Sequence, residues 1–219
     1  IKICLNRIYR MFMKYLLPIL VAFCLFACQR YSDNWEKICD IENYIESRPD
    51  SALAVLEAID VEKLSSDEER AKYALYMSMA LDKNYIDVSE DSIASVAVNY
   101  YSRKGPMKYR ARAYYYLGLA YYYQQDYDRA ILEFTKAEKA AEVSDSLYLG
   151  MTKSIQGHSY YETHNLEEVL NCFHKAYDIY SALSEYSKAC SVMYKLISTY
   201  IAKLEFEKAE EMLLDLLDN

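Results

Sequence analysis

The chain has 219 residues, of which 53% are hydrophobic and 26% are charged, a balance that argues against a disordered chain and allows one sizeable core. Four glycines and three prolines leave few turn signals for a multi-stranded sheet, so the composition predicts an all-helical protein. The net charge is −8, and the 25 tyrosines supply large side chains that can lie half buried with the hydroxyl in water.

The first segment has the pattern of an export signal. Residues 15–27 form an apolar run that follows the basic residues Lys2, Arg7, Arg10 and Lys14. A membrane-spanning helix needs about 20 residues, whereas a secretory hydrophobic region has about 7 to 15. We therefore expect residues 1–27 to be a removed signal peptide and residues 28–33 to be a tether. The alternative is an uncleaved anchor.

The end of this run, Leu25-Phe26-Ala27-Cys28, resembles a bacterial lipobox, although Phe26 is bulkier than that motif prefers. The resemblance implies that Cys28 becomes the new N-terminus, carries palmitate-type acyl chains and anchors an exported protein to a bacterial membrane, facing the periplasm or in the outer membrane. Since residue 1 is not methionine, translation is expected to begin at Met11 or Met13.

Without residues 1–28 the chain carries 21 basic and 33 acidic side chains, which repel nucleic acid, so no nucleic-acid partner is expected. One basic cluster surrounds Gly105-Pro106. It predicts a solvated turn between helices or, alternatively, a site for an acidic partner segment. Its members are Arg103, Lys104, Lys108, Arg110 and Arg112.

Helical patterns follow one another closely from residue 34 onward. Pro49 ends the first helix and Asp50 can cap the second, while Ser66 and Glu69 form a capping box and Asn165 is another cap signal. The predicted helices pair into hairpins of about 34–60, 66–104, 107–142, 146–181 and 185–218. The helices are expected at about 34–47, 51–59, 67–81, 91–102, 107–123, 127–142, 146–162, 166–180, 185–203 and 206–217.

The pattern of residues 111–137 returns further along the chain. Tyr121, Ala130, Phe134 and Ala137 recur 39 residues later as Tyr160, Val169, Phe173 and Ala176, and 40 residues after that as Tyr200, Ala209, Leu213 and Leu216. Gly118 recurs as Gly157, and Ile197 stands at the third position. Self-similarity at this period is typical of stacked helical hairpins.

These residues resemble the tetratricopeptide repeat, whose pattern is W-x2-L-G-x2-Y, then A-x3-F, then P. In the first copy Tyr114 stands for the tryptophan and Glu142 for the proline, and the intervening residues match. The second copy departs at Lys153, Gln156 and Val169. The resemblance implies a right-handed superhelical array of antiparallel helix hairpins, an α-solenoid over residues 34–219.

Packing gives the repeated residues a physical reason. A glycine inside a helix costs about 1 kcal/mol relative to alanine, so Gly118 and Gly157 are expected where paired helices approach closely. The full set of expected packing residues is Gly118, Tyr121, Ala130, Phe134, Gly157, Tyr160, Phe173, Ala176, Tyr200 and Ala209.

The resemblance further implies that the first helix of each hairpin lines a concave, peptide-binding groove. Aromatic residues there would grip an extended or helical peptide. The alternative is that these tyrosines pack between repeats. By register, the groove residues would be Arg112, Tyr115, Leu119, Tyr122, Ser154, His158, Tyr161, Tyr194, Ser198 and Ile201.

Residues for enzymatic or metal chemistry are scarce. His158, His164 and His174 lie on two helices and the turn between them without ligand spacing, so no metal, cofactor or catalytic site is expected. Cys172 and Cys190 are predicted to be free thiols like Cys39, with a bridge between them as the alternative.

The sequence thus predicts a lipid-anchored scaffold of the cell envelope that binds a protein or peptide. One alternative is the envelope-facing sensor region of a longer tetratricopeptide-containing transcriptional regulator, and another is a glycan-capturing lipoprotein. The apolar residues of the last helix would be covered by another repeat, by a partner or by a second copy in a homodimer. They are Met212, Leu213, Leu216 and Leu217.

Overall fold

The computed structural model describes residues 31–86 and 88–218, so the predicted signal peptide and Cys28 lie outside the described residues. Within this part every regular element is a helix, and none of these helices is long and apolar enough to cross a membrane. A short 3-10 turn spans Val61–Lys63. The α-helices are α2 (Trp35–Ile41), α3 (Pro49–Glu57), α4 (Asp67–Lys83), α5 (Asp91–Tyr101), α6 (Met107–Tyr123), α7 (Tyr127–Ala141), α8 (Ser146–Glu162), α9 (Leu166–Ala182), α10 (Tyr186–Ala202) and α11 (Phe206–Asp218).

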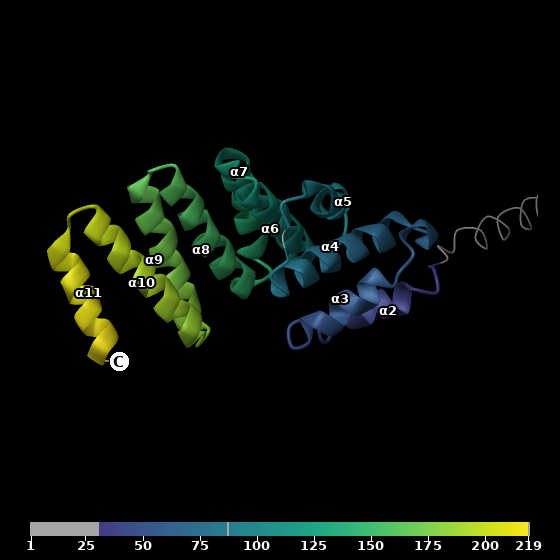
Figure 1. The fold of residues 1–219 in the computed structure, drawn as a ribbon, viewed down its shortest axis with the longest axis horizontal. Coiled ribbons are helices and arrows are strands. Elements are labelled where there is room, and N and C mark those ends of the chain that lie inside the picture. The colour runs from purple at the N-terminus through teal and green to yellow at the C-terminus, as the bar shows by residue number, and fades with distance from the viewer. Residues whose placement is uncertain (1–30, 87, 219) are drawn as a thin grey trace, which may run out of the picture.

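The helices form a row of antiparallel hairpins, with α2 and α3 at one end and α11 at the other (Figure 1). Each helix from α4 onward packs on its neighbours in the chain, and the first helices of successive hairpins also touch, α4 with α6 and α6 with α8. The predicted all-helical hairpin array is confirmed. The helices α6 and α8 begin and end at the predicted residues.

The largest difference from the predicted helix ends lies in the N-terminal hairpin, whereas the ends of the helices from α4 onward fall within two residues of the prediction. The first helix stops at Ile41, after which the chain continues to Ser47 in turns whose backbone bonds are partly of the tighter i to i+3 type. The second helix begins at Pro49, ahead of the predicted cap Asp50, with Arg48 as N-cap. Proline suits the first helical position because its φ is preset and its missing N–H would have no helical partner there.

The predicted caps at Ser66 and Asn165 are present. The Ser66 hydroxyl accepts a hydrogen bond from the Glu69 amide at 3.2 Å, and the Glu69 carboxylate accepts one from the Ser66 amide, also at 3.2 Å. The same carboxylate accepts a hydrogen bond from the Ser32 amide at 2.5 Å, which connects the start of the described chain to α4. The Asn165 side chain accepts from the Glu168 amide at 3.4 Å.

Similar turns recur along the array. A non-glycine residue with a positive φ of 58 to 63° lies in five of them, four inside hairpins and one between α9 and α10. In three of the turns inside hairpins, the amide of the following residue donates a hydrogen bond of 2.9 Å to the carbonyl of Tyr121, Tyr160 or Tyr200. This bond closes the end of the helix. The repeated tyrosine therefore marks the residue on which the turn closes. The five residues are Tyr85, Gln125, His164, Ser184 and Leu204.

The predicted close approach at the repeated glycines is confirmed. A Cβ atom added to Gly118 would lie 2.7 Å from the Phe134 ring, and one added to Gly157 would lie 2.6 Å from the Phe173 ring. The sequence pattern missed a third contact of this kind, between Gly150 and Tyr180. Of the other expected packing residues, Ala130, Ala176, Tyr200 and Ala209 are buried, whereas Tyr121 and Tyr160 are half buried.

Candidate functional site

The residues expected to line the groove lie at equivalent positions on α6, α8 and α10. Together with the equivalent residues of α4, we call these the inner positions. Their exposure changes along the array. In the first series, Leu75 is 0% exposed and Tyr115 is 6% exposed, Ser154 is half buried, and Tyr194 is 69% exposed. The series Met79, Leu119, His158 and Ser198 shows the same trend from buried to exposed. The inner positions are therefore closed in the N-terminal hairpins and open over α8 and α10.

The prediction that Tyr115 and Leu119 line a groove is wrong, because both side chains are buried. The Tyr115 ring packs edge-on against Tyr148 with centroids 5.4 Å apart and lies 6.0 Å from Phe134. Burial raises the pKa of Tyr115 well above its usual value. For these two residues the alternative, packing between repeats, holds.

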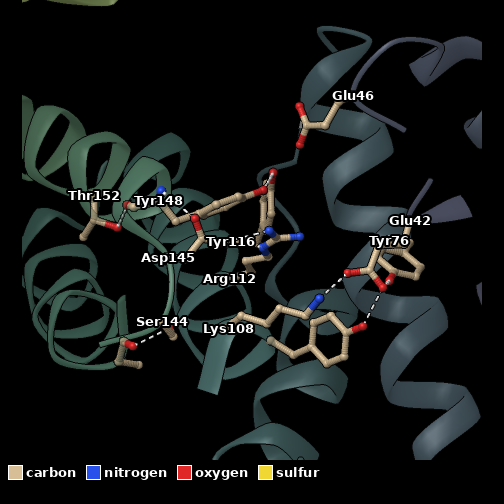
Figure 2. A network of polar contacts seen from close by, with 12 residues as sticks. Glu42, Glu46, Tyr76, Lys108, Arg112, Tyr116, Ser144, Asp145, Tyr148 and Thr152 are labelled. Atoms are coloured by element: carbon tan, nitrogen blue, oxygen red, sulfur yellow. Dashed lines mark hydrogen bonds and ion pairs between the residues drawn. The ribbon is translucent and has the colours of Figure 1, made fainter. Parts of the chain in front are cut away.

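A network of polar side chains joins the N-terminal hairpin to α6, beside the buried inner positions (Figure 2). The Glu42 carboxylate accepts hydrogen bonds from Lys108 Nζ at 2.6 Å, Tyr109 Oη at 2.6 Å and Tyr76 Oη at 3.0 Å. Burial opposes the charge on Glu42, but these bonds lower its pKa to about 2. The ionised carboxylate thus connects three helices.

Arg112 was expected to face a ligand, but its side chain is half buried and bound within the chain. Its Nη2 lies 2.8 Å from Asp145 Oδ2, and its guanidinium carbon lies 4.7 Å from the centroid of the Tyr148 ring (Figure 2). The Tyr148 hydroxyl in turn lies 3.0 Å from that of Tyr116. Since Asp145 is the N-cap of α8, Arg112 positions the start of that helix.

The rest of the basic cluster near Gly105 is also partly engaged. Lys108 is paired with Glu42, and Arg110 Nε donates to the Tyr101 carbonyl at 2.7 Å. Three of its five members thus make hydrogen bonds within the chain, and Lys104 lies 5.9 Å from the centroid of the Tyr100 ring. These contacts leave less positive charge for an acidic partner than the sequence alone suggested.

The open part of the inner positions carries aromatic and aliphatic side chains. We call it the open inner face and define it as His158, Tyr161, Tyr194, Ser198 and Ile201; all but His158 are exposed. Tyr122, at the neighbouring position on α6, and Ser154, on α8, are half buried at its border.

His158 contributes no positive charge to this face at neutral pH. Burial, helped by the nearby charge of Lys195, lowers its pKa to about 4. Its ring packs edge-on against Phe173 with centroids 5.4 Å apart. Burial also lowers the pKa of Lys195, whose ammonium lies 5.8 Å from the centroid of the Phe173 ring.

The structure does not bring the three histidines together. His164 lies in the turn after α8, and His174 on α9 bonds the Tyr200 hydroxyl at 2.9 Å. Within the described residues, no three side chains of His, Cys, Asp or Glu are grouped so that they could hold a metal ion.

The cysteines of the described chain, Cys39, Cys172 and Cys190, are free thiols. Cys172 is buried and Cys190 is exposed, which argues against the alternative of a bridge between them. Burial raises the pKa of Cys172 to about 11, so this thiol is poorly reactive.

The chain is similar to several solved helical-repeat structures. MamA (AMB-1) is 15% identical with a TM-score of 0.56, over 84% of this chain and 94% of that one. A putative kinesin light chain with tetratricopeptide-like repeats from Podosopora anserina is 14% identical with a TM-score of 0.59, over 84% and 91%. BtubC (BKLC) from P. vanneervenii is 15% identical with a TM-score of 0.61, over 84% and 74%.

The fold is a tetratricopeptide-like α-solenoid. At 14 to 15% identity these similarities show the fold and leave function to the site. No protein-family model matches the chain, and no curated protein matches it. The solenoid nevertheless explains why the open inner face is continuous, since each hairpin adds one equivalent helix to the row.

Proposed function

We propose that the protein is a protein-interaction scaffold and that the open inner face binds its partner. One observation carries this proposal. Positions that are buried or half buried in the N-terminal hairpins hold exposed aromatic and aliphatic side chains, Tyr161, Tyr194 and Ile201, in the C-terminal ones. Apolar side chains gathered on one face of a soluble protein are typical of interaction sites.

The chemistry of this face suits a peptide with apolar side chains. Tyrosine supplies a large contact area at low entropic cost and is enriched where binding energy is concentrated. The hydroxyls of Tyr161, Tyr194 and Ser198 add hydrogen bonding without charge, and His158 is neutral at pH 7. A helical or extended segment that places apolar side chains on one side would bury them here.

The test is to select peptides from a random library on the purified protein and to map the tightest binder by chemical-shift changes. We expect the largest shifts at amides of α8 and α10 around Tyr161, Tyr194 and Ser198. Shifts confined to the outer helices α7 and α9 would contradict the proposal.

The location of the scaffold rests on residues 1–28, and we propose that Cys28 anchors it in the bacterial cell envelope. An apolar run followed by a lipobox-like Leu25 to Cys28 supports this proposal. The Cys28→Ser variant should leave the membrane fraction, whereas unchanged fractionation would contradict lipidation.

A second apolar surface lies on the last helix, where Leu213 and Leu214 are exposed. It supports the hypothesis that α11 packs against a second copy of the chain. Sedimentation at increasing protein concentration measures this association. A monomer at all concentrations would exclude such a homodimer.

A further inference from the structure

A hollow of about 770 Å³ lies where α4 and α6 end and the N-terminal hairpin turns back. This volume is in the range of sites that hold small ligands or large side chains. The sequence did not indicate it, because its walls come from three separate segments. Its lining residues are Glu46, Pro49, Asp82, Lys83, Tyr85, Ile86 and Tyr123.

The charges that line the hollow leave a net negative site. Glu46 and Asp82 contribute carboxylates, while the single ammonium, that of Lys83, is bound to Glu46 at 2.5 Å. With Lys83 neutralised by Glu46, the charge of Asp82 is left over. Charge complementarity therefore favours a cationic ligand over an anionic one.

Asp82 lacks the internal partner that a half-buried carboxylate usually has. No residue of the described chain makes a hydrogen bond or an ion pair with its carboxylate, and Asp82 is half buried. Burial raises its pKa, an effect that the charge of Lys83 only partly offsets. A cation placed beside Asp82 would compensate the lost hydration of this carboxylate.

Two tyrosines flank the same hollow. Tyr85 lies in the turn after α4 with a φ of 58°, and its side chain is 97% exposed. Tyr123 is 51% exposed. Aromatic faces attract ammonium and guanidinium groups, and the effect grows when the cation is partly withdrawn from water. An acidic group beside aromatic rings thus matches an arginine or lysine side chain.

The hollow continues the row of inner positions. Asp82, Tyr122, Tyr161 and Ile201 are equivalent residues spaced 40, 39 and 40 apart, on α4, α6, α8 and α10. Going from α10 toward the N-terminus, the open inner face therefore leads past Tyr122 to Asp82. A peptide lying along the row would reach the hollow with one of its ends.

We propose that this hollow binds an arginine or lysine side chain of a peptide partner, with Asp82 as its counter-ion and Tyr85 and Tyr123 beside it. The proposal rests on the proposed function, because it places the rest of the peptide on the open inner face. It adds the chemistry of the partner: a segment with a basic residue toward one end and apolar residues along the rest.

The probe is the tripeptide Ac-Phe-Arg-Phe-NH2, compared by isothermal titration with its citrulline twin, which keeps the shape and lacks the charge. We expect the arginine peptide to bind at least about tenfold more tightly. Asp82→Asn should remove this preference, whereas Glu142→Gln, an exposed carboxylate at the end of α7, should retain it. Thermal unfolding of both variants shows that the fold is kept.

Equal affinity for the two tripeptides, no binding of either, or an unchanged preference in Asp82→Asn would overturn the proposal. Its failure is separable from that of the proposed function. If library peptides still map to α8 and α10 while the charge preference is missing, only the cation site is wrong. If the tripeptide shows the preference while library peptides avoid α8 and α10, the open inner face is wrong.

Discussion

Phe134 lies over Gly118 so closely that a methyl group on this glycine would sit 2.7 Å from two carbons of the ring. The same relationship joins Phe173 to Gly157 one repeat later. Atoms that close overlap, so the glycine is required by the shape of the helix crossing and not by the conformation of its own backbone. This contact holds the two helices of each central hairpin together.

Gly118→Ala should therefore destabilise the protein by about 1 to 3 kcal/mol, measured by urea unfolding. Helix propensity alone predicts a gain of about 1 kcal/mol, so the two effects have opposite signs. In a Phe134→Leu background the penalty should shrink, because the ring that causes the overlap is gone. A stabilised Gly118→Ala protein would contradict the close-packing account.

The buried ion pair between Lys153 and Glu138 gives a second prediction. The two groups lie 2.5 Å apart with side chains 7% and 17% exposed, and Lys153 stands where the first repeat has Tyr114. Glu138→Ala should cost about 3 kcal/mol, because it leaves an unpaired buried ammonium.

The matched double variant Glu138→Leu with Lys153→Met should stay within about 1 kcal/mol of the wild type, since it removes both charges and fills similar space with apolar side chains. Thermal and urea unfolding measure both variants. Equal losses in the two would indicate that the pair contributes net stability, against this expectation.

Most of the fold can be predicted from signals within single hairpins, whereas the candidate binding surface depends on contacts between hairpins. Caps such as Ser66 and the repeated Gly118 and Phe134 act within one hairpin, so the sequence places the helices α6 and α8 correctly. The burial of Tyr115 depends on Tyr148 in the next hairpin, which no local pattern reveals. The hollow beside Asp82 likewise requires Glu46 to arrive from a distant segment.

Acid should destabilise the protein in part through His158. Its pKa is about 4 in the folded chain against 6.5 in the unfolded one, so the unfolded state binds more protons between these values. The stability that depends on neutral His158 is complete above pH 6.5 and is lost as the pH falls toward 4.

His158→Gln, which cannot be protonated, should lose less stability than the wild type between pH 6.5 and 5, by about 1 kcal/mol. Urea unfolding at the two pH values measures this difference. Parallel losses in both proteins would show that His158 is not responsible.

The central claim is that the open inner face binds the partner, and the affinity of a library-selected peptide for two variants tests it most directly. Tyr194→Ala combined with Ile201→Ala removes two exposed side chains from this face, while Leu132→Ala removes an equally exposed one from the outer helix α7. We predict that the double variant keeps its helical circular dichroism and binds the peptide at least about tenfold more weakly, a loss of about 1.4 kcal/mol, with Leu132→Ala unchanged. Wild-type affinity in the double variant, or an equal loss in Leu132→Ala, would contradict the claim.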